Sequence, residues 1–200
     1  MVEEYYARTS NHGYETCVEH LSMAAAFSGG FSGAFGQLEE GMLAGLFHDA
    51  GKYSEAFQKR IRDPEHVMKV DHSTAGAAKT GEQGHLYAAM AIAGHHAGLP
   101  SFGATVDTSQ DSSFQGRIKR AREHPDTINC TAMGEQFDFV SLSSIKADTT
   151  PRDIYTMMMR IRMIFSGLVD GDRLDAEFFT KDNMSREEWE LLHEIKDFFG

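Results

Sequence analysis

The clearest hydrophobic pattern in the chain lies between residues 37 and 50. Apolar side chains recur there at steps of three and four residues, which places them on one face of a helix. We therefore predict a helix over 37–50, with Gly51 as its C-cap. The glycines around 29–36 are expected to end an earlier helix. Similar patterns, caps and alanine-rich stretches predict the other helices, over 16–27, 54–62, 73–79, 86–93, 153–179 and 187–198.

The segment 98–150 lacks this periodicity. It holds proline, glycine and serine and then a basic patch, and an apolar pattern returns only at 137–142. We interpret it as a long irregular connection with one or two short helices, and connections of this length are often functional. Strand signals are scarce along the whole chain. The sequence thus predicts an all-α, compact helical bundle that forms a single domain over 1–200.

The composition is that of a folded but acidic domain. Hydrophobic residues make up 41% of the 200 positions, and the formal net charge is −11. Proteins that bind nucleic acid tightly by themselves are usually basic, so this charge argues against autonomous binding of DNA or RNA. Phosphodiester chemistry stays open, because two divalent ions would add about four positive charges at one point.

The sequence also bears on the compartment. No apolar run is long enough to span a membrane, and the polar segment 1–10 does not resemble a signal peptide. Cys17 and Cys130 give no disulfide framework, so we expect a cytoplasmic protein with reduced thiols and no membrane partner. Cys17 stands three residues before His20, and we favour a buried structural thiol over a thiolate ligand.

Several metal-seeking side chains stand where apolar structure meets a break of small residues. Imidazole and carboxylate without thiolate suit Mn, Fe, Co, Ni or Zn. The set consists of His20 in the first predicted helix, His48 and Asp49 at the end of helix 37–50, His72 before an alanine-rich helix, the pair His95 and His96 after another, and Asp172 in the long helix 153–179. The remaining histidines lack such surroundings and are expected at the surface; they are His12, His66, His85, His124 and His193.

Four segments carry a resemblance to a known family. They read LFHDAGKY at 46–53, VDHSTAGA at 70–77, GHHAGL at 94–99 and SGLVDGDRLD at 166–175. In this order they resemble the HD superfamily of metal-dependent phosphohydrolases. The closer resemblance is to the HD nuclease domain of the CRISPR type I nuclease-helicase, which degrades foreign DNA after Cascade recruits it. A lone His-Asp pair is a weak signal of this family. Four ordered segments that are spread over most of the region 20–180 are a specific one.

The resemblance implies two divalent metal ions that share one carboxylate. The first ion is assigned to His20, His48, Asp49 and Asp172, and the second to Asp49, His72, His95 and His96. Mn, Fe, Co or Ni are the expected metals, with Zn and Mg as alternatives. Asp49 and Lys52 are the expected catalytic residues, Asp49 as the bridge and Lys52 to orient the phosphate or stabilise its charge. Asp170 and Asp175 compete with Asp172; the family pattern of a small residue before the aspartate favours Asp172, although Gly171 replaces the usual alanine.

The function implied by the resemblance is hydrolysis of phosphodiester bonds in single-stranded DNA, as an endo- or exonuclease of CRISPR antiviral defence. The implied partners are Cascade and a helicase domain, fused beyond residue 200 or separate, since this chain has no Gly-Lys-Ser/Thr phosphate loop. Two alternatives remain open: a phosphohydrolase acting on nucleotides or another small phosphoester, and a degenerate, non-enzymatic docking module. The basic patch, which comprises Arg117, Lys119, Arg120 and Arg122, is interpreted as a solvated face, with a DNA-backbone contact as the alternative.

Overall fold

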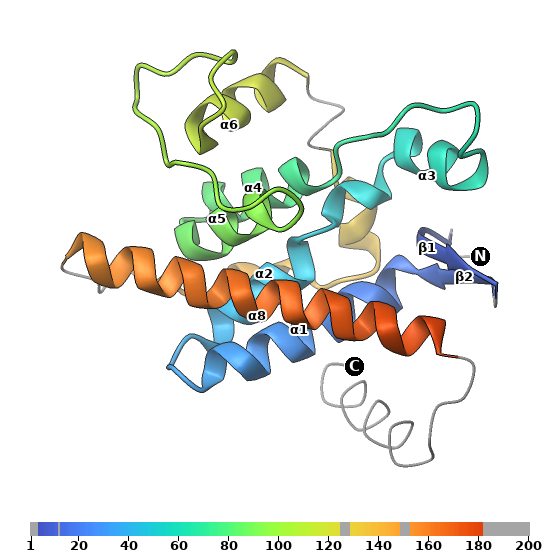
Figure 1. Ribbon diagram of the computed structural model, residues 1–200, viewed down its shortest axis with the longest axis horizontal. Helices are drawn as coiled ribbons and strands as arrows, with labels where there is room; N and C mark the ends of the chain where they lie inside the picture. The colour runs from blue at the N-terminus through green and yellow to red at the C-terminus, as the bar shows by residue number, and fades with distance from the viewer. Residues whose placement is uncertain (1–3, 12, 125–128, 149–152, 182–200) are drawn as a thin grey trace.

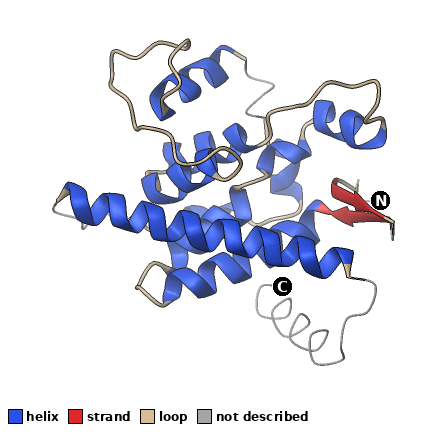
Figure 2. Cartoon of the chain, viewed as in Figure 1, coloured by secondary structure: helices blue, strands red, loops and turns tan. Residues whose placement is uncertain are grey.

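The fold was established from a computed structural model that describes residues 4–11, 13–124, 129–148 and 153–181. The chain is predominantly helical and compact, as the sequence predicts, and it carries one small sheet (Figures 1 and 2). Among the described residues, no helix has both the length and the apolar character that crossing a membrane requires. The predicted helix over 187–198 lies outside the described residues.

The sheet is an antiparallel hairpin near the N-terminus, which the sequence did not reveal. Strand β1 covers Tyr6–Ser10 and β2 covers Gly13–Thr16, and they pair Arg8 opposite Glu15. Strands this short give little alternation of apolar and polar residues, so they are difficult to recognise from the sequence. The hairpin brings Arg8 to the edge of the helical core.

Helix α1, Cys17–Gly33, is longer than predicted. It begins with a capping box, in which Thr16 accepts a bond from the Glu19 amide and the Glu19 side chain accepts from the Thr16 amide. The predicted end at residue 27 is wrong, although the helix does end within the glycine-containing segment 29–36. Gly29 stays helical because α1 packs closely on α2, and a Cβ at this position would lie 3.2 Å from that of Met42. The small residue allows close helix packing there.

Helix α2, Leu38–Phe47, ends three residues before the predicted boundary. His48 is its C-cap, and after Asp49 the 3₁₀ helix η1 covers Ala50–Tyr53. Gly51 therefore lies inside η1 and is not a cap. Its amide donates a 2.9 Å bond to the carbonyl of His72, and a Cβ on Gly51 would come within 2.6 Å of the His72 Cα. This tertiary contact fixes the chain between α2 and η1.

Three further helices follow the prediction closely. Helix α3, Glu55–Arg62, begins at the predicted Ser54 cap, whose Oγ accepts a bond from the Phe57 amide. Helix α4 covers Ser73–Glu82 and α5 covers Leu86–Gly94. Within α4, a Cβ on Gly76 would overlap the carbonyl of Phe47, so the glycine lets α4 lie directly against the end of α2. Because η1 follows the end of α2 after two residues, this packing also keeps the start of η1 close to α4.

The long connection holds short helices, as predicted: α6, Phe114–Glu123; the 3₁₀ helix η3, Thr131–Glu135; and α7, Phe139–Ser143. Helix α8, Ile154–Thr180, is capped by Asp153, whose side chain accepts a bond from the Thr156 amide.

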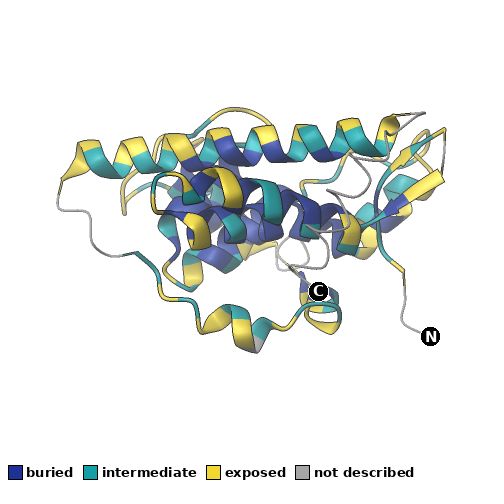
Figure 3. Cartoon of the chain, turned by 90° about the horizontal axis from the view of Figure 1, so that it is seen from below, coloured by how far each residue is buried: buried dark blue, intermediate teal, exposed yellow. Residues whose placement is uncertain are grey.

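Helix α8 runs along one side of the bundle and packs on α1, α2 and α5 (Figure 1). Figure 3 shows the buried residues gathered between α8 and the helices beneath it. The core combines a few large side chains, among them Leu21, Phe47, Ile92 and Leu168, with many alanines. Alanine lets helix axes approach closely, so ends of several helices meet in one small volume.

Candidate metal centre

Five segments of the chain, from six helical elements, meet at Asp49. His20 comes from the middle of α1, Asp172 from α8, and His48 with Asp49 from the turn between α2 and η1. His72 is the residue before α4, and His95 and His96 follow α5. The structure thus brings together all seven side chains that the sequence predicts as metal ligands.

The two oxygens of Asp49 face two different groups of side chains. Oδ2 lies 3.1 Å from Nε2 of His20 and 3.3 Å from Nε2 of His48. Oδ1 lies 3.4 Å from Nε2 of both His72 and His95. Asp49 is itself buried. One carboxylate therefore lies between two groups of imidazoles, each of which belongs to a cluster that could hold a metal ion.

The first group is His20, His48 and Asp172, completed by Asp49 Oδ2. Asp172 Oδ1 lies 3.7 Å from Nε2 of His48 and 3.9 Å from Nε2 of His20. Both imidazoles are fully buried. These donor atoms lie within 4.8 Å of one another, so the group can hold a metal ion.

The second group is Asp49, His72, His95 and His96, whose donor atoms meet the same 4.8 Å limit. Nε2 of His72 is 2.7 Å from Nε2 of His96, and His96 Nε2 is 4.0 Å from Asp49 Oδ1. This group is more open than the first, because 53% of the His96 side chain is exposed, as is 21% of the His72 side chain. The second group is therefore the more accessible of the two to solvent.

Backbone carbonyls set the orientation of three imidazoles. Nδ1 of His48 donates a 2.7 Å bond to the Gly45 carbonyl, Nδ1 of His72 donates to Val70, and Nδ1 of His95 donates to Ile92. A carbonyl only accepts, so each ring carries a proton on Nδ1 and turns its Nε2 atom towards Asp49. Such bonds from the distal nitrogen orient histidines in metal sites.

Two buried atoms at the centre have no hydrogen-bond partner in the described part of the chain, Asp49 Oδ1 and His95 Nε2. They face each other at 3.4 Å. A carboxylate oxygen and an imidazole lone pair repel each other unless a cation lies between them, and burial makes an unsatisfied pair costly. A divalent metal ion removes this conflict, so the residues present fit the metal that the sequence implies.

The electrostatics of the first group also demand positive charge. Burial disfavours the imidazolium form of His48, but Asp49 and Asp172 outweigh burial and raise its pKa to about 10. Burial alone would raise the pKa of Asp49, yet His48 and Lys52 hold it well below its usual range. The carboxylates thus stay charged and attract a cation, either protons on the imidazoles or a metal ion.

An arginine and two further carboxylates surround His20. Asp175 Oδ2 accepts a 2.6 Å bond from Nδ1 of His20. Arg8 lies 3.1 Å from Asp175, 3.0 Å from Asp172 and, through Nε, 2.8 Å from Glu15. Glu15, His20 and Asp175 also form a group that could hold a metal ion, and Arg8 pairs with both of its carboxylates. Sequence reasoning missed Arg8 and Glu15 because both lie in the hairpin.

The structure distinguishes the three aspartates near residue 172. Asp170 is exposed, Asp172 faces the first group, and Asp175 is buried behind His20. Asp172 is therefore the one placed as a ligand.

Cys17 is buried and free, and burial raises the pKa of its thiol to about 12, which favours the structural thiol expected from the sequence.

One histidine expected at the surface is buried. His85 donates from Nδ1 to Glu40 at 2.7 Å, and the other oxygen of Glu40 accepts from the Ala88 amide at 3.0 Å. The prediction for His85 is wrong, because its partner lies 45 residues away in α2. His66 and His124 are exposed, as predicted; His12 and His193 lie outside the described residues.

The basic patch is occupied by contacts within the chain. Arg117 bonds Asp71, Ser73, Thr74 and the Ala93 carbonyl. Lys119 donates to the carbonyls of Thr105 and Asp107, and Arg122 lies 3.7 Å from Glu82. Because Arg117 and Lys119 make these contacts, the four basic residues do not form a continuous solvated face.

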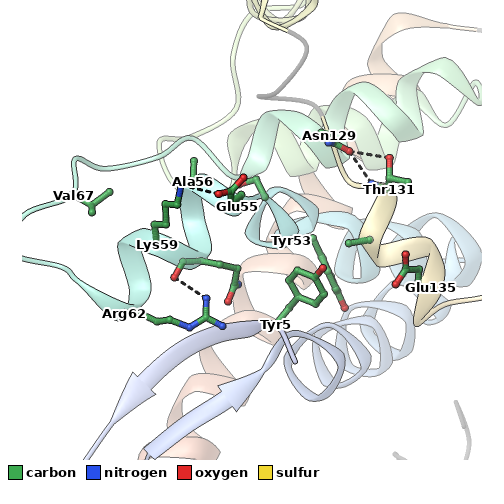
Figure 4. Close-up of a pocket in the computed structure, with 13 residues that line it drawn as sticks. Tyr5, Tyr53, Glu55, Ala56, Lys59, Arg62, Val67, Asn129, Thr131 and Glu135 are labelled. Atoms are coloured by element: carbon green, nitrogen blue, oxygen red, sulfur yellow. Dashed lines mark hydrogen bonds and ion pairs between the residues drawn. The ribbon is translucent and has the colours of Figure 1, made fainter. Parts of the chain in front are cut away.

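A large cavity lies apart from the candidate ligands. Its volume is about 990 Å³, and its walls come from α3, η3, Tyr5 and Tyr53 (Figure 4). None of the seven candidate ligands lines it. The volume of this cavity therefore does not indicate where the candidate metal centre lies. The donor atoms of the centre pack too closely to leave a large empty space.

No family model matches the chain, and no curated protein matches it. The geometry of the histidine and aspartate cluster in this helical fold is compatible with an HD-like protein. The finer assignment depends on the four motifs and on the chemistry of the site.

Proposed function

We propose that this chain is an HD-type, metal-dependent nuclease that hydrolyses phosphodiester bonds of single-stranded DNA in CRISPR antiviral defence. The observation that carries the proposal is Asp49, whose two oxygens face separate histidine groups on opposite sides. Two divalent ions bound at such a site bind the phosphoryl group, activate water and stabilise the leaving oxygen. Four ordered HD-like motifs support the same proposal, since they supply six of the seven candidate ligands, all except His20.

The side chains of the site divide the work. Asp49 holds the first and second groups of ligands in place relative to each other. The bonds from Nδ1 to backbone carbonyls keep the rings of His48, His72 and His95 directed at Asp49. Lys52 is buried with its ammonium 2.6 Å from Asp49 Oδ2. In the proposed reaction Lys52 donates to a phosphate oxygen and stabilises its growing negative charge. The half-exposed His96 marks the side from which the strand enters.

The proposed partners follow from charge. A domain of net charge −11 attracts DNA weakly by itself, so the strand is delivered to the ions by another protein. We propose a helicase domain for this role and the Cascade complex as the recruiting assembly. Both are inferred from the family resemblance and the acidic composition.

The test compares substrates and variants under metal control. Metal content is measured by elemental analysis, and single-stranded DNA and mononucleotides are assayed side by side with Mn, Fe, Co, Ni, Zn or Mg. We expect metal-dependent cleavage of DNA and its loss in Asp49→Ala, with helicity retained by circular dichroism. Asp170→Ala, an exposed aspartate, serves as the matched control.

Two outcomes would overturn the proposal. Hydrolysis of mononucleotides without cleavage of DNA would favour the small-phosphoester alternative. A well-folded protein that binds no metal at all would instead support a degenerate docking module.

A further inference from the structure

Arg117, on α6, bonds to both chain segments that carry the second histidine group. Its Nη2 donates to Ser73 Oγ at 2.6 Å and lies 3.2 Å from Asp71 Oδ1, and its Nε donates to Thr74 Oγ1 at 2.5 Å. Its Nη1 donates to the carbonyl of Ala93 at the end of α5. One planar guanidinium therefore connects the start of α4 to the end of α5.

These contacts flank the candidate ligands in the sequence. His72 stands between Asp71 and Ser73, and Ala93 comes two residues before His95. Asp71 also accepts bonds from the amides of Ser73 and Thr74, so Arg117 acts on the side chain that caps α4. The hydrogen bonds of the arginine go to neighbours of the histidines in the sequence, three of them through side chains and one through the Ala93 carbonyl.

Ring orientation depends on the same backbone. His72 bonds the Val70 carbonyl at 3.0 Å and His95 bonds the Ile92 carbonyl at 2.8 Å. A shift of either segment thus moves the corresponding Nε2 atom. Metal–nitrogen bonds are short, about 2.0–2.1 Å for zinc, so a displacement near 1 Å abolishes coordination.

The burial and the hydrogen bonds of Arg117 favour a role within the fold over direct contact with DNA. Only 24% of its side chain is exposed, and all three of its nitrogens are bonded within the chain. Arg122 on the same helix makes a useful contrast. Its side chain is 59% exposed, and within the described residues it forms an ion pair with Glu82 at 3.7 Å. The two arginines lie on the same helix and carry the same charge. Arg117 bonds to the segments that carry His72 and His95, whereas Arg122 pairs with Glu82.

We propose that Arg117 is a positioning residue that holds His72 and the His95–His96 pair in register for the second metal ion. This inference rests on the proposed two-ion site and deepens it. No substitution at Arg117 removes a ligand, and the first group, built on α1, α2 and α8, does not touch it. Loss of the arginine should therefore weaken one ion selectively.

The experiment is a titration of the metal-free protein with Co²⁺, followed by calorimetry and by the visible absorption of bound Co²⁺. The variants are Arg117→Met, which keeps an unbranched stem, and Arg117→Lys, with Arg122→Met as the matched control. Wild type and Arg122→Met are expected to bind two ions. In Arg117→Met the first ion keeps its affinity, whereas the second binds about 10–100-fold more weakly. Arg117→Lys should recover part of the loss, since lysine keeps the charge but cannot span both segments.

Two results would overturn the inference: unchanged binding of both ions in Arg117→Met, or equal weakening of both ions, which would indicate a general structural role. Wild-type protein that binds only one ion would overturn it together with the two-ion site. Wild-type protein that binds two ions but cleaves no DNA would refute the proposed function alone, and the affinity of the second ion would still decide the role of Arg117.

Discussion

The ammonium of Lys52 lies 2.6 Å from Oδ2 of Asp49, and both side chains are buried. The same oxygen faces His20 and His48. Lys52 thus places its ammonium against the carboxylate that we propose to bridge two ions. A buried ion pair of this kind strongly resists loss of one partner, because the remaining charge would be left uncompensated.

Replacing Lys52 should therefore have different effects with and without metal. In metal-free protein we expect Lys52→Met to lower the free energy of unfolding by about 3 kcal/mol, because the Asp49 carboxylate loses its nearest cation. In metal-loaded protein the ions supply that charge and the loss should be smaller. Thermal unfolding with a chelator and with Mn²⁺ measures the difference.

The control for this comparison is Lys59→Met, whose exposed ammonium pairs with the exposed Glu55. It should change neither form appreciably. An equal loss of stability for Lys52→Met in both forms would show that Lys52 does not compensate Asp49 as we infer.

The three neighbouring aspartates should affect the first ion to different degrees. Asp172→Asn removes a candidate ligand and should weaken the first ion most. Asp175→Asn keeps an acceptor oxygen but removes the negative charge that faces Nδ1 of His20, and should cost about 10–100-fold in affinity. Asp170→Asn, at an exposed position, should leave metal binding unchanged. Calorimetric titration of the three variants gives the order, and a larger effect at Asp170 than at Asp172 would contradict the assignment.

Gly76 should tolerate no side chain. A Cβ there would overlap the Phe47 carbonyl, so Gly76→Ala must displace α4 from α2 and should destabilise the protein by about 1–3 kcal/mol. Gly30→Ala, with no atom within 4 Å of the added Cβ, should instead stabilise α1 by up to about 1 kcal/mol. Chemical denaturation measures both changes. Equal effects would mean that the contact between α4 and α2 is looser than described.

Cys17 should be unreactive in the native protein. Burial raises its thiol pKa to about 12, so little thiolate exists at pH 8 and iodoacetamide should modify Cys17 only after unfolding. The thiol of the unfolded chain ionises first as the pH rises. The contribution of Cys17 to stability is therefore complete below its ordinary pKa and lost as the pH approaches about 12. Peptide mapping with and without urea tests this, and fast native labelling would disprove it.

The sequence predicts those parts of the centre that have local signals. Adjacent polar residues at the ends of apolar helices revealed His48, Asp49, His72, His95 and His96, and most helices follow from periodicity and caps. The remaining features depend on contacts between distant segments. The early end of α2 follows from the contact of Gly51 with His72, and Arg8 reaches the centre only through the hairpin. Such contacts leave no periodic pattern in either segment.

The bond from the Gly51 amide to the His72 carbonyl joins the two halves of the centre through main chain alone. Asp49 stands two residues before this donor, and the His72 ring is on the acceptor residue itself. Ordering of the turn by one ion therefore orders part of the neighbouring ligand set at the same time. Binding of one ion therefore leaves less conformational entropy to be lost when the other binds.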